Sequence, residues 1–318
     1  MGGKRREAED FFGVSYKDFK LQRDRRYGTA NPDLMEVPLW ATMIKHGHPS
    51  YFLQMAYQES NPAEERPIWT FDRRGMTCTE LPDRRAIYIG GEHEDSYDPN
   101  FCIFNGVIVR SPNGEYQIYG YPKHDFPPTD FHTATLVEGY PAGNYGNGIV
   151  IIGGLGYEED RIPGITNVHV LQFDSHTSYN YLITRTDTKG DNPGWIWGHQ
   201  AVLTADGESV IVFAGKAIDA NGGTVPMDDV YRLDLSSLAW ERVGDLPVKE
   251  LLKPKVDDSQ ELDMFVMKNL FGHQGTEESL SEDQKRRIML KHEIARGESF
   301  YTPEMLAELK AMLDALKE

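Results

Sequence analysis

The chain has 318 residues, 39% hydrophobic and 26% charged, values typical of a soluble globular protein with one or two domains. Its formal net charge of −17 would repel a phosphate backbone or an anionic membrane, so neither nucleic acid nor membrane is an expected partner. Two cysteines exclude a small disulfide framework, and without a long apolar run or an apolar leader the sequence predicts a cytoplasmic protein.

Three segments differ in their residue patterns. Residues 1–65 mix charges with short amphipathic pieces, which predicts a helical or irregular N-terminal segment. Residues 66–244 alternate short apolar runs with glycine-rich turns, which predicts a mostly β domain. Residues 245–318 predict a helical tail.

The β segment repeats one signature three times, an apolar strand that ends in two small residues. The three small pairs, in chain order, are Gly90-Gly91, Gly153-Gly154 and Ala214-Gly215. A histidine followed by a short strand precedes the second and third apolar runs, at His132 and His199. Two more strand-like runs follow each small pair, so each unit is predicted to be a four-stranded sheet.

Packing explains why such units would recur. A lone four-stranded sheet cannot bury both faces, whereas sheets stacked radially cover one another. The small pairs allow the backbone to turn sharply where the next unit approaches. Three blades do not close a ring. Either residues 35–65 supply further strands, or helices cap an open fan, or two chains close the ring together.

The pattern resembles the kelch repeat of galactose-oxidase-like β-propellers. The resemblance is carried by the small pairs, by the Val-Tyr-Arg-Leu-Asp run at 230–234 and by Trp240, and residues 131–243 are similar to kelch-like proteins of microbes and fungi. It implies a kelch-type β-propeller with three clear four-stranded blades and helical segments at both ends. It also implies that loops on one propeller face bind a ligand.

That face should bring together basic and aromatic side chains suited to a peptide, another protein or a small molecule. The candidate ligand-binding residues are Arg73, Arg74, Tyr157, Trp195, Trp197 and Lys216. Trp195 and Trp197 flank Ile196, so in an extended strand they would share one face. They either anchor a ligand or pack between blades.

The densest polar cluster follows the first small pair. Glu92, His93, Glu94 and Asp98 could bind a divalent metal, because carboxylate and imidazole ligands suit iron, manganese or zinc. The spacing Glu94-x3-Asp98-x3-Cys102 is similar to the Glu-x3-Asp-x3-His iron motif of kelch-type nitrile-specifier proteins, with cysteine in place of histidine. The alternative is an acidic, solvated loop with a turn that begins at Asp98.

The two repeated histidines also allow two interpretations. His132 and His199 either hold neighbouring blades in register by hydrogen bonding, or point into a central funnel as acid–base groups together with Asp130. The sequence therefore supports a binding module that uses one propeller face, with a metal-dependent enzyme as the alternative.

The predicted tail is best defined near its end, where Thr302 suits an N-cap and Pro303 the first helical turn. One apolar stripe then follows at helical spacing: Met305, Leu306, Leu309, Met312, Leu313 and Leu316. This helix would either cap the propeller edge or join two chains in a homodimer.

Overall fold

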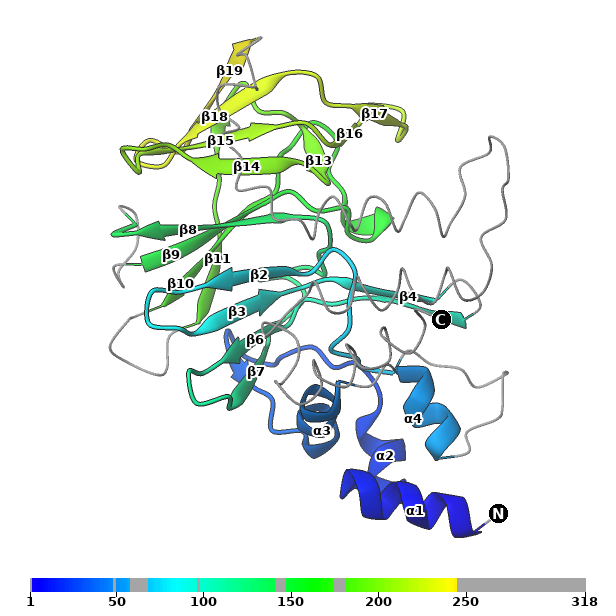
Figure 1. Ribbon diagram of the computed structural model, residues 1–318. Coiled ribbons are helices and arrows are strands. Elements are labelled where there is room, and N and C mark those ends of the chain that lie inside the picture. Colours follow the sequence, from blue (N-terminus) through cyan, green and yellow to red (C-terminus); the bar gives the residue numbers. More distant parts are fainter. Residues whose placement is uncertain are drawn as a thin grey trace, which may run out of the picture. The chain divides into compact units, whose positions relative to one another are not determined.

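A computed structural model describes residues 2–47, 50–57, 68–95, 98–140, 147–173 and 181–244 (Figure 1). The chain divides into two units, Met1–Leu246 and Pro247–Glu318, and the described residues all belong to the first. This unit is mostly β, with antiparallel sheets and few helices, as the sequence predicts. The expected helical tail at 245–318 lies outside the described residues.

The described part of the N-terminal segment contains four helices: α1 (Gly2–Phe12), α2 (Tyr16–Gln22), α3 (Pro38–His46) and α4 (Ser50–Ala56). Helix α2 starts at a side-chain cap, because the Ser15 hydroxyl accepts a hydrogen bond from the Asp18 N–H (3.1 Å). Helix α3 has Pro38 in its first turn and ends at Gly47, whose φ of 63° is left-handed.

Three sheets of four or five strands form most of the β part. The first has the order β1 (Asp33–Leu34), β7 (Tyr116–Gly120), β6 (Val107–Arg110), β3 (Ala86–Ile89), β2 (Thr77–Glu80). The second has the order β11 (Leu182–Arg185), β10 (Val168–Phe173), β9 (Asn147–Ile152), β8 (Thr133–Glu138). The third has the order β12 (Lys189–Gly190), β19 (Ala239–Gly244), β18 (Val230–Asp234), β15 (Ser209–Phe213), β14 (Gln200–Leu203). The four predicted strands of each unit are thus antiparallel neighbours, and the strand before the small pair is always second from the β2, β8 or β14 edge.

Smaller elements extend from these sheets. They are the hairpin β4 (Glu92–Asp95) with β5 (Asp98–Ile103), the 3-10 turn Glu158–Asp160, and the sheet β13 (Trp195–Trp197), β16 (Lys216–Ile218), β17 (Thr224–Pro226). Each follows or approaches a small pair, so insertions collect at one end of the sheets.

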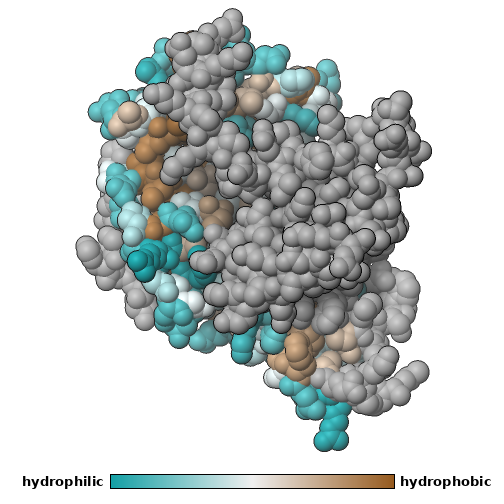
Figure 2. All heavy atoms as spheres, in the orientation of Figure 1, coloured by the Kyte–Doolittle hydropathy of each residue, from teal (hydrophilic) through white to brown (hydrophobic). Residues whose placement is uncertain are grey.

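The middle sheet is buried on both faces. Ile149 and Ile151 of β9 pack into a core shared with the first sheet, and Val150 and Ile152 pack into a core shared with the third. Strand β9 is therefore apolar throughout, since alternate side chains point to opposite faces. Figure 1 shows the three sheets one above another within this unit. In Figure 2 a hydrophobic patch lies on the side where Figure 1 draws β8 and β14. Val202 of β14 keeps 39% of its surface exposed.

The N-terminal segment covers the other face of the first sheet. Tyr88, which points away from the middle sheet, has its ring 5.3 Å from that of Phe71. Trp40 of α3 stacks on Trp69 at 4.9 Å and 7°. Strand β1 also adds to the outer edge of β7. At this end of the stack, helices and irregular chain cap the sheet, which was one of the three predicted solutions.

The small pairs adopt the backbone conformation that their composition predicts. Gly90, Gly153 and Ala214 have φ of 62°, 69° and 56°, all left-handed. A Cβ on Gly90 would stand 2.3 Å from the Thr129 carbonyl oxygen, and one on Gly153 would stand 2.4 Å from that of Ile196. The chain that enters each following sheet therefore crosses directly over the small pair of the sheet before it.

Candidate ligand-binding rim

We use the term rim for the end of the sheets where the small pairs lie and where the chain enters β2, β8 and β14. Two sets of equivalent positions line it. The residues three positions before these strands are Arg74, Asp130 and Trp197, and those directly after the small pairs are Glu92, Leu155 and Lys216. Backbone pairing joins the two sets as Arg74 with Glu92, Asp130 with Leu155, and Trp197 with Lys216. Equivalent backbone positions thus carry unlike side chains.

A second row of backbone contacts connects neighbouring sheets. The Phe131 N–H donates to the Gly75 carbonyl (2.9 Å), and the Gly198 N–H donates to the Phe131 carbonyl (2.8 Å). All three residues have left-handed φ, so Phe131 occupies a position at which the other units have glycine. Its ring lies 6.0 Å from Trp197. Sequence analysis missed Phe131, although its place directly before His132 matches that of Gly198 before His199.

The repeated histidines lie between sheets. His132 Nε2 is 2.9 Å from the Thr77 hydroxyl, and His199 Nε2 is 2.9 Å from the Thr133 hydroxyl. Both histidines are buried, and burial lowers the pKa of each to about 3, with neighbouring histidines contributing at His132. Both are therefore neutral at pH 7. This geometry favours the structural interpretation, in which they hold neighbouring sheets in register, over acid–base catalysis.

Two predicted site residues from different units meet as a carboxyl pair. Glu92 and Asp130 are both buried, and the Glu92 side chain lies close enough to lower the pKa of Asp130, whose Oδ2 has no hydrogen-bond partner among the described residues. The Gly156 N–H donates to Asp130 Oδ1 (2.7 Å). Burial raises the pKa of Asp130, while Glu92, this hydrogen bond and the charge of Arg161 oppose the rise. Two buried carboxyl groups this close are most stable when they hold one proton between them, because two adjacent negative charges repel each other.

This pair predicts a pH-dependent stability. Between the ordinary pKa of 3.8 and the raised value, the folded chain holds a proton at Asp130 that the unfolded chain releases, so stability falls as pH rises through that window. In Asp130→Asn the amide can accept from Gly156 and donate to Glu92 at any pH. We expect the variant to be more stable than the wild type by about 1 kcal/mol at pH 8, and this gain to vanish near pH 4. Urea unfolding at both pH values measures this, and a loss of stability at pH 8 would contradict a shared proton.

The two tryptophans of β13 have different surroundings. Ile196 between them points into the core, so both lie on the opposite strand face, as predicted. Trp195 is buried and its indole N–H donates to the Leu155 carbonyl (3.2 Å). Trp197 is half-buried, and Lys216 Nζ lies 4.7 Å from its ring centre. Of the predicted ligand-binding set, Lys216 is thus exposed, and Trp197 is half-buried like Arg74 and Tyr157.

Tyr157 joins the loop that follows β9 of the middle sheet to residues near the first sheet. Its hydroxyl accepts hydrogen bonds from the Ile103 N–H (2.9 Å) and from Arg25 Nη1 (3.2 Å). Arg25 was not singled out in the sequence, because nothing in its spacing indicates a contact 132 residues away along the chain.

Arg73, one of the expected ligand-binding residues, is buried and is not exposed at the rim. It keeps 6% of its surface exposed and donates to the carbonyls of Thr70 (2.7 Å) and Gly90 (3.0 Å). Its guanidinium lies 3.8 Å from the ring centre of Phe104 and 5.0 Å from that of Trp69. This side chain therefore joins the N-terminal segment to the first small pair.

The expected metal ligands are described only in part. His93 Nε2 lies 3.0 Å from the Ser50 hydroxyl of α4, and Glu92 belongs to the carboxyl pair. The side chains of Glu94 and Asp98 fall outside the described residues. Among the residues that the structure describes, no group of three His, Cys, Asp or Glu side chains is arranged to hold a metal ion. The complete four-residue set remains a prediction.

Four of the eight exposed large apolar side chains in the described residues lie on segments that follow the small pairs, a feature that the sequence patterns did not reveal. They are Phe101 (45% exposed), Ile162 (41%), Ile165 (44%) and Val225 (40%). A polar concave region of about 350 Å³ lies at the other end of the first sheet, between the β2–β3 and β6–β7 turns.

Comparison with known proteins gives little further guidance. No family model and no curated protein matches the chain. A solved structure titled "Structure of YjhT" aligns with a TM-score of 0.36 and 13% identity, over 59% of this chain and 55% of that chain. The chain thus spans about half the length of that protein, and a likeness of this size does not identify a family. None of the described helices combines the length and the apolar character that crossing a membrane requires.

Proposed function

We propose that the chain is a cytoplasmic, kelch-type β-propeller module whose rim binds an extended segment of another protein. The observation that carries this proposal is the rim itself. Equivalent backbone positions, fixed from sheet to sheet by hydrogen bonds, present chemically different side chains on one side of a rigid frame. Such loops on a fixed scaffold are where binding residues are usually placed.

The exposed groups at the rim suit a protein partner. The half-buried Trp197 and the exposed Lys216 offer an aromatic ring and a cation, the kind of centre that dominates binding energy at interfaces. The four exposed apolar residues of the rim supply further contact area from three successive units.

A metal-dependent enzyme remains the alternative, with His132, His199 and Asp130 as its acid–base groups. It is less well supported, because both histidines are buried against threonines and Asp130 is fully buried beside Glu92. Metal analysis of the purified full chain would revive it if iron, manganese or zinc were present at one equivalent per chain.

Peptide display against the full-length protein tests the binding proposal. Selected peptides should bind Trp197→Ala and Lys216→Glu at least about tenfold more weakly than the wild type, as expected for residues at the centre of an interface. Lys189→Glu is the matched control, because this exposed lysine lies on β12 at the end of the third sheet opposite its small pair. If the two rim variants keep wild-type affinity, or if the control loses as much, the rim is not the binding surface.

A further inference from the structure

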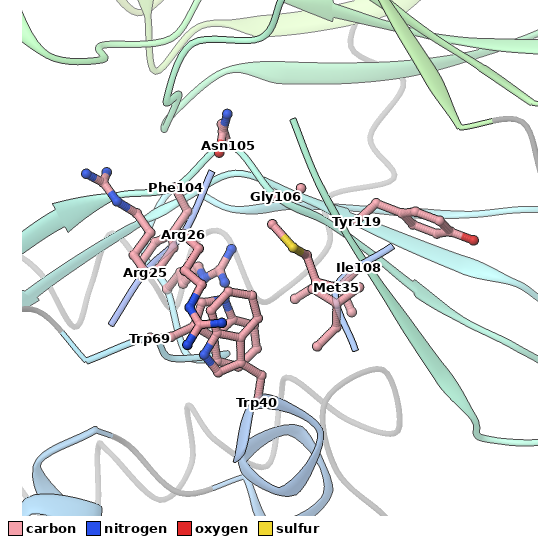
Figure 3. A pocket seen from close by; sticks show the side chains of 13 residues that line it. Arg25, Arg26, Met35, Trp40, Trp69, Phe104, Asn105, Gly106, Ile108 and Tyr119 are labelled. Carbon is pink, nitrogen blue, oxygen red and sulfur yellow. The ribbon is translucent and has the colours of Figure 1, made fainter. Parts of the chain in front are cut away.

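A small cavity lies between the N-terminal segment and the first sheet (Figure 3). It offers about 10 Å³ to the centre of a water-sized guest, which is room for a single small molecule or ion. Its walls include the stacked Trp40 and Trp69, the ring of Phe104 and the backbone of Gly106. Three arginines also line it: Arg25, Arg26 and Arg73.

None of these arginines forms an ion pair with a residue in the described part of the chain. Their hydrogen bonds all go to uncharged oxygens: Arg25 to the Ile103 carbonyl and Tyr157 hydroxyl, Arg26 to the Leu21 carbonyl, and Arg73 to the Thr70 and Gly90 carbonyls. Three positive charges around one cavity without a carboxylate are unusual in a chain whose net charge is −17. The cavity is therefore electropositive within an acidic protein.

Arg73 is the most deeply buried of the three arginines, so its charge loses the most hydration. Its Nε and Nη1 donate to carbonyls, whereas its Nη2 donates to no described residue, and Arg73 is one of the residues that line the cavity. Burial lowers the pKa of Arg73 to about 9, so the group is still charged at neutral pH. A buried charge that no carboxylate of the described residues neutralises is costly, and contact with two aromatic rings offsets only part of that cost.

We propose that this cavity binds one small monovalent anion, chloride, against the Arg73 guanidinium. The anion would supply the acceptor that Nη2 lacks and neutralise a charge that no described carboxylate reaches. Size favours a single atom, because the cavity is too small to enclose a phosphate or sulfate. Arg26 is solvent-exposed at the cavity wall and provides a polar approach from solution.

Thermal unfolding of the full chain at constant ionic strength tests the proposal. Replacing sodium gluconate by sodium chloride should raise Tm by about 3 °C along a saturable curve, as expected for a ligand that binds the folded state. In Gly106→Ala the added methyl group would contact only the Tyr119 carbonyl, at 3.4 Å, and would otherwise occupy open space at the cavity wall. This variant should fold and lose the chloride response. Arg232→Gln, which removes an exposed arginine ion-paired with Glu241, is the control and should keep it.

Bromide can locate the anion site directly, because a bound bromide ion gives an anomalous diffraction signal. Crystals soaked in sodium bromide should show an anomalous peak within hydrogen-bonding distance of Arg73 Nη2, and that peak should be absent in Gly106→Ala. A chloride response that persists in Gly106→Ala would overturn the proposal, as would a peak elsewhere with none at Arg73. Stabilisation by sodium formate and not by chloride would also overturn it, because the site would then recognise a carboxylate. The test is independent of peptide binding at the rim.

Discussion

Gly153→Ala should destabilise the folded protein by about 3 kcal/mol or more, among the largest effects expected of a single methyl group. The cause is geometric. An alanine Cβ at this position would stand 2.4 Å from the Ile196 carbonyl oxygen and 2.7 Å from His199 Cε1. The Ile196 carbonyl lies on β13, just before the chain enters the third sheet, and it accepts a hydrogen bond from the Gly154 N–H (2.8 Å). The backbone at Ile196 therefore cannot move away without breaking that bond. The added methyl group therefore acts on the junction between two sheets.

Gly139→Ala is the matched control. Gly139 has almost the same left-handed φ, 66° against 69°, and belongs to the same unit, but beyond its chain neighbours no atom lies within 4 Å of the place that a Cβ would occupy. It should cost only about 1 kcal/mol, the conformational penalty alone. Urea unfolding of both variants gives the comparison. Equal losses would mean that the close approach of the next sheet contributes nothing at Gly153.

Acid should unfold the protein well above the pH at which its carboxylates titrate. His132, His169 and His199 are buried and neutral, and burial lowers the pKa of each from 6.5 to about 3. Below pH 6.5 the unfolded chain binds protons that the folded chain does not, so stability falls as pH falls from 6.5 towards 3. At pH 4.5 each histidine should cost about 2 to 3 kcal/mol relative to pH 7.5, and three together approach the whole stability of an ordinary domain.

Urea midpoints measured at pH 7.5 and 4.5 test this expectation. His199→Gln should start less stable at pH 7.5, because the contact with Thr133 is altered, yet lose less stability on acidification than the wild type. His124→Gln should behave like the wild type, since the His124 side chain is 83% exposed. If His199→Gln loses as much stability on acidification as the wild type, the His199 imidazole of the wild type accepts a proton in the folded state.

The parts of the fold that could be predicted are those that depend on short, local residue patterns in the sequence. Apolar runs before Gly90, Gly153 and Ala214 indicated strands, and the small residues indicated the sharp turns that the structure contains. The cover on the first sheet could not be predicted. The stacking of Trp40 on Trp69, and of Arg73 between Trp69 and Phe104, joins elements whose sequence spacing follows no period.

The candidate site was predictable to a similar extent. Repeat alignment placed Asp130, Trp197 and Lys216 at one end of the sheets, where the structure has them. It could not reveal that Asp130 would meet Glu92, or that Arg73 would turn inward while Arg74 stays at the rim, because neighbouring residues of an irregular segment have no fixed facing. Burial and partners depend on the packing of separate units, which a single sequence does not encode by spacing.

The histidine–threonine contacts have a direction that bears on how many sheets such a chain can join. The first and second sheets each offer a threonine hydroxyl at the first residue of the edge strand, and the following sheet supplies the imidazole. The first unit has Met76 where its successors have histidine, and the third begins its edge strand with Gln200 where the others have threonine. The series of histidine–threonine contacts therefore begins at the first described sheet and ends at the third. Lengthening it by design would require both a histidine in the added unit and the exchange of Gln200 for threonine.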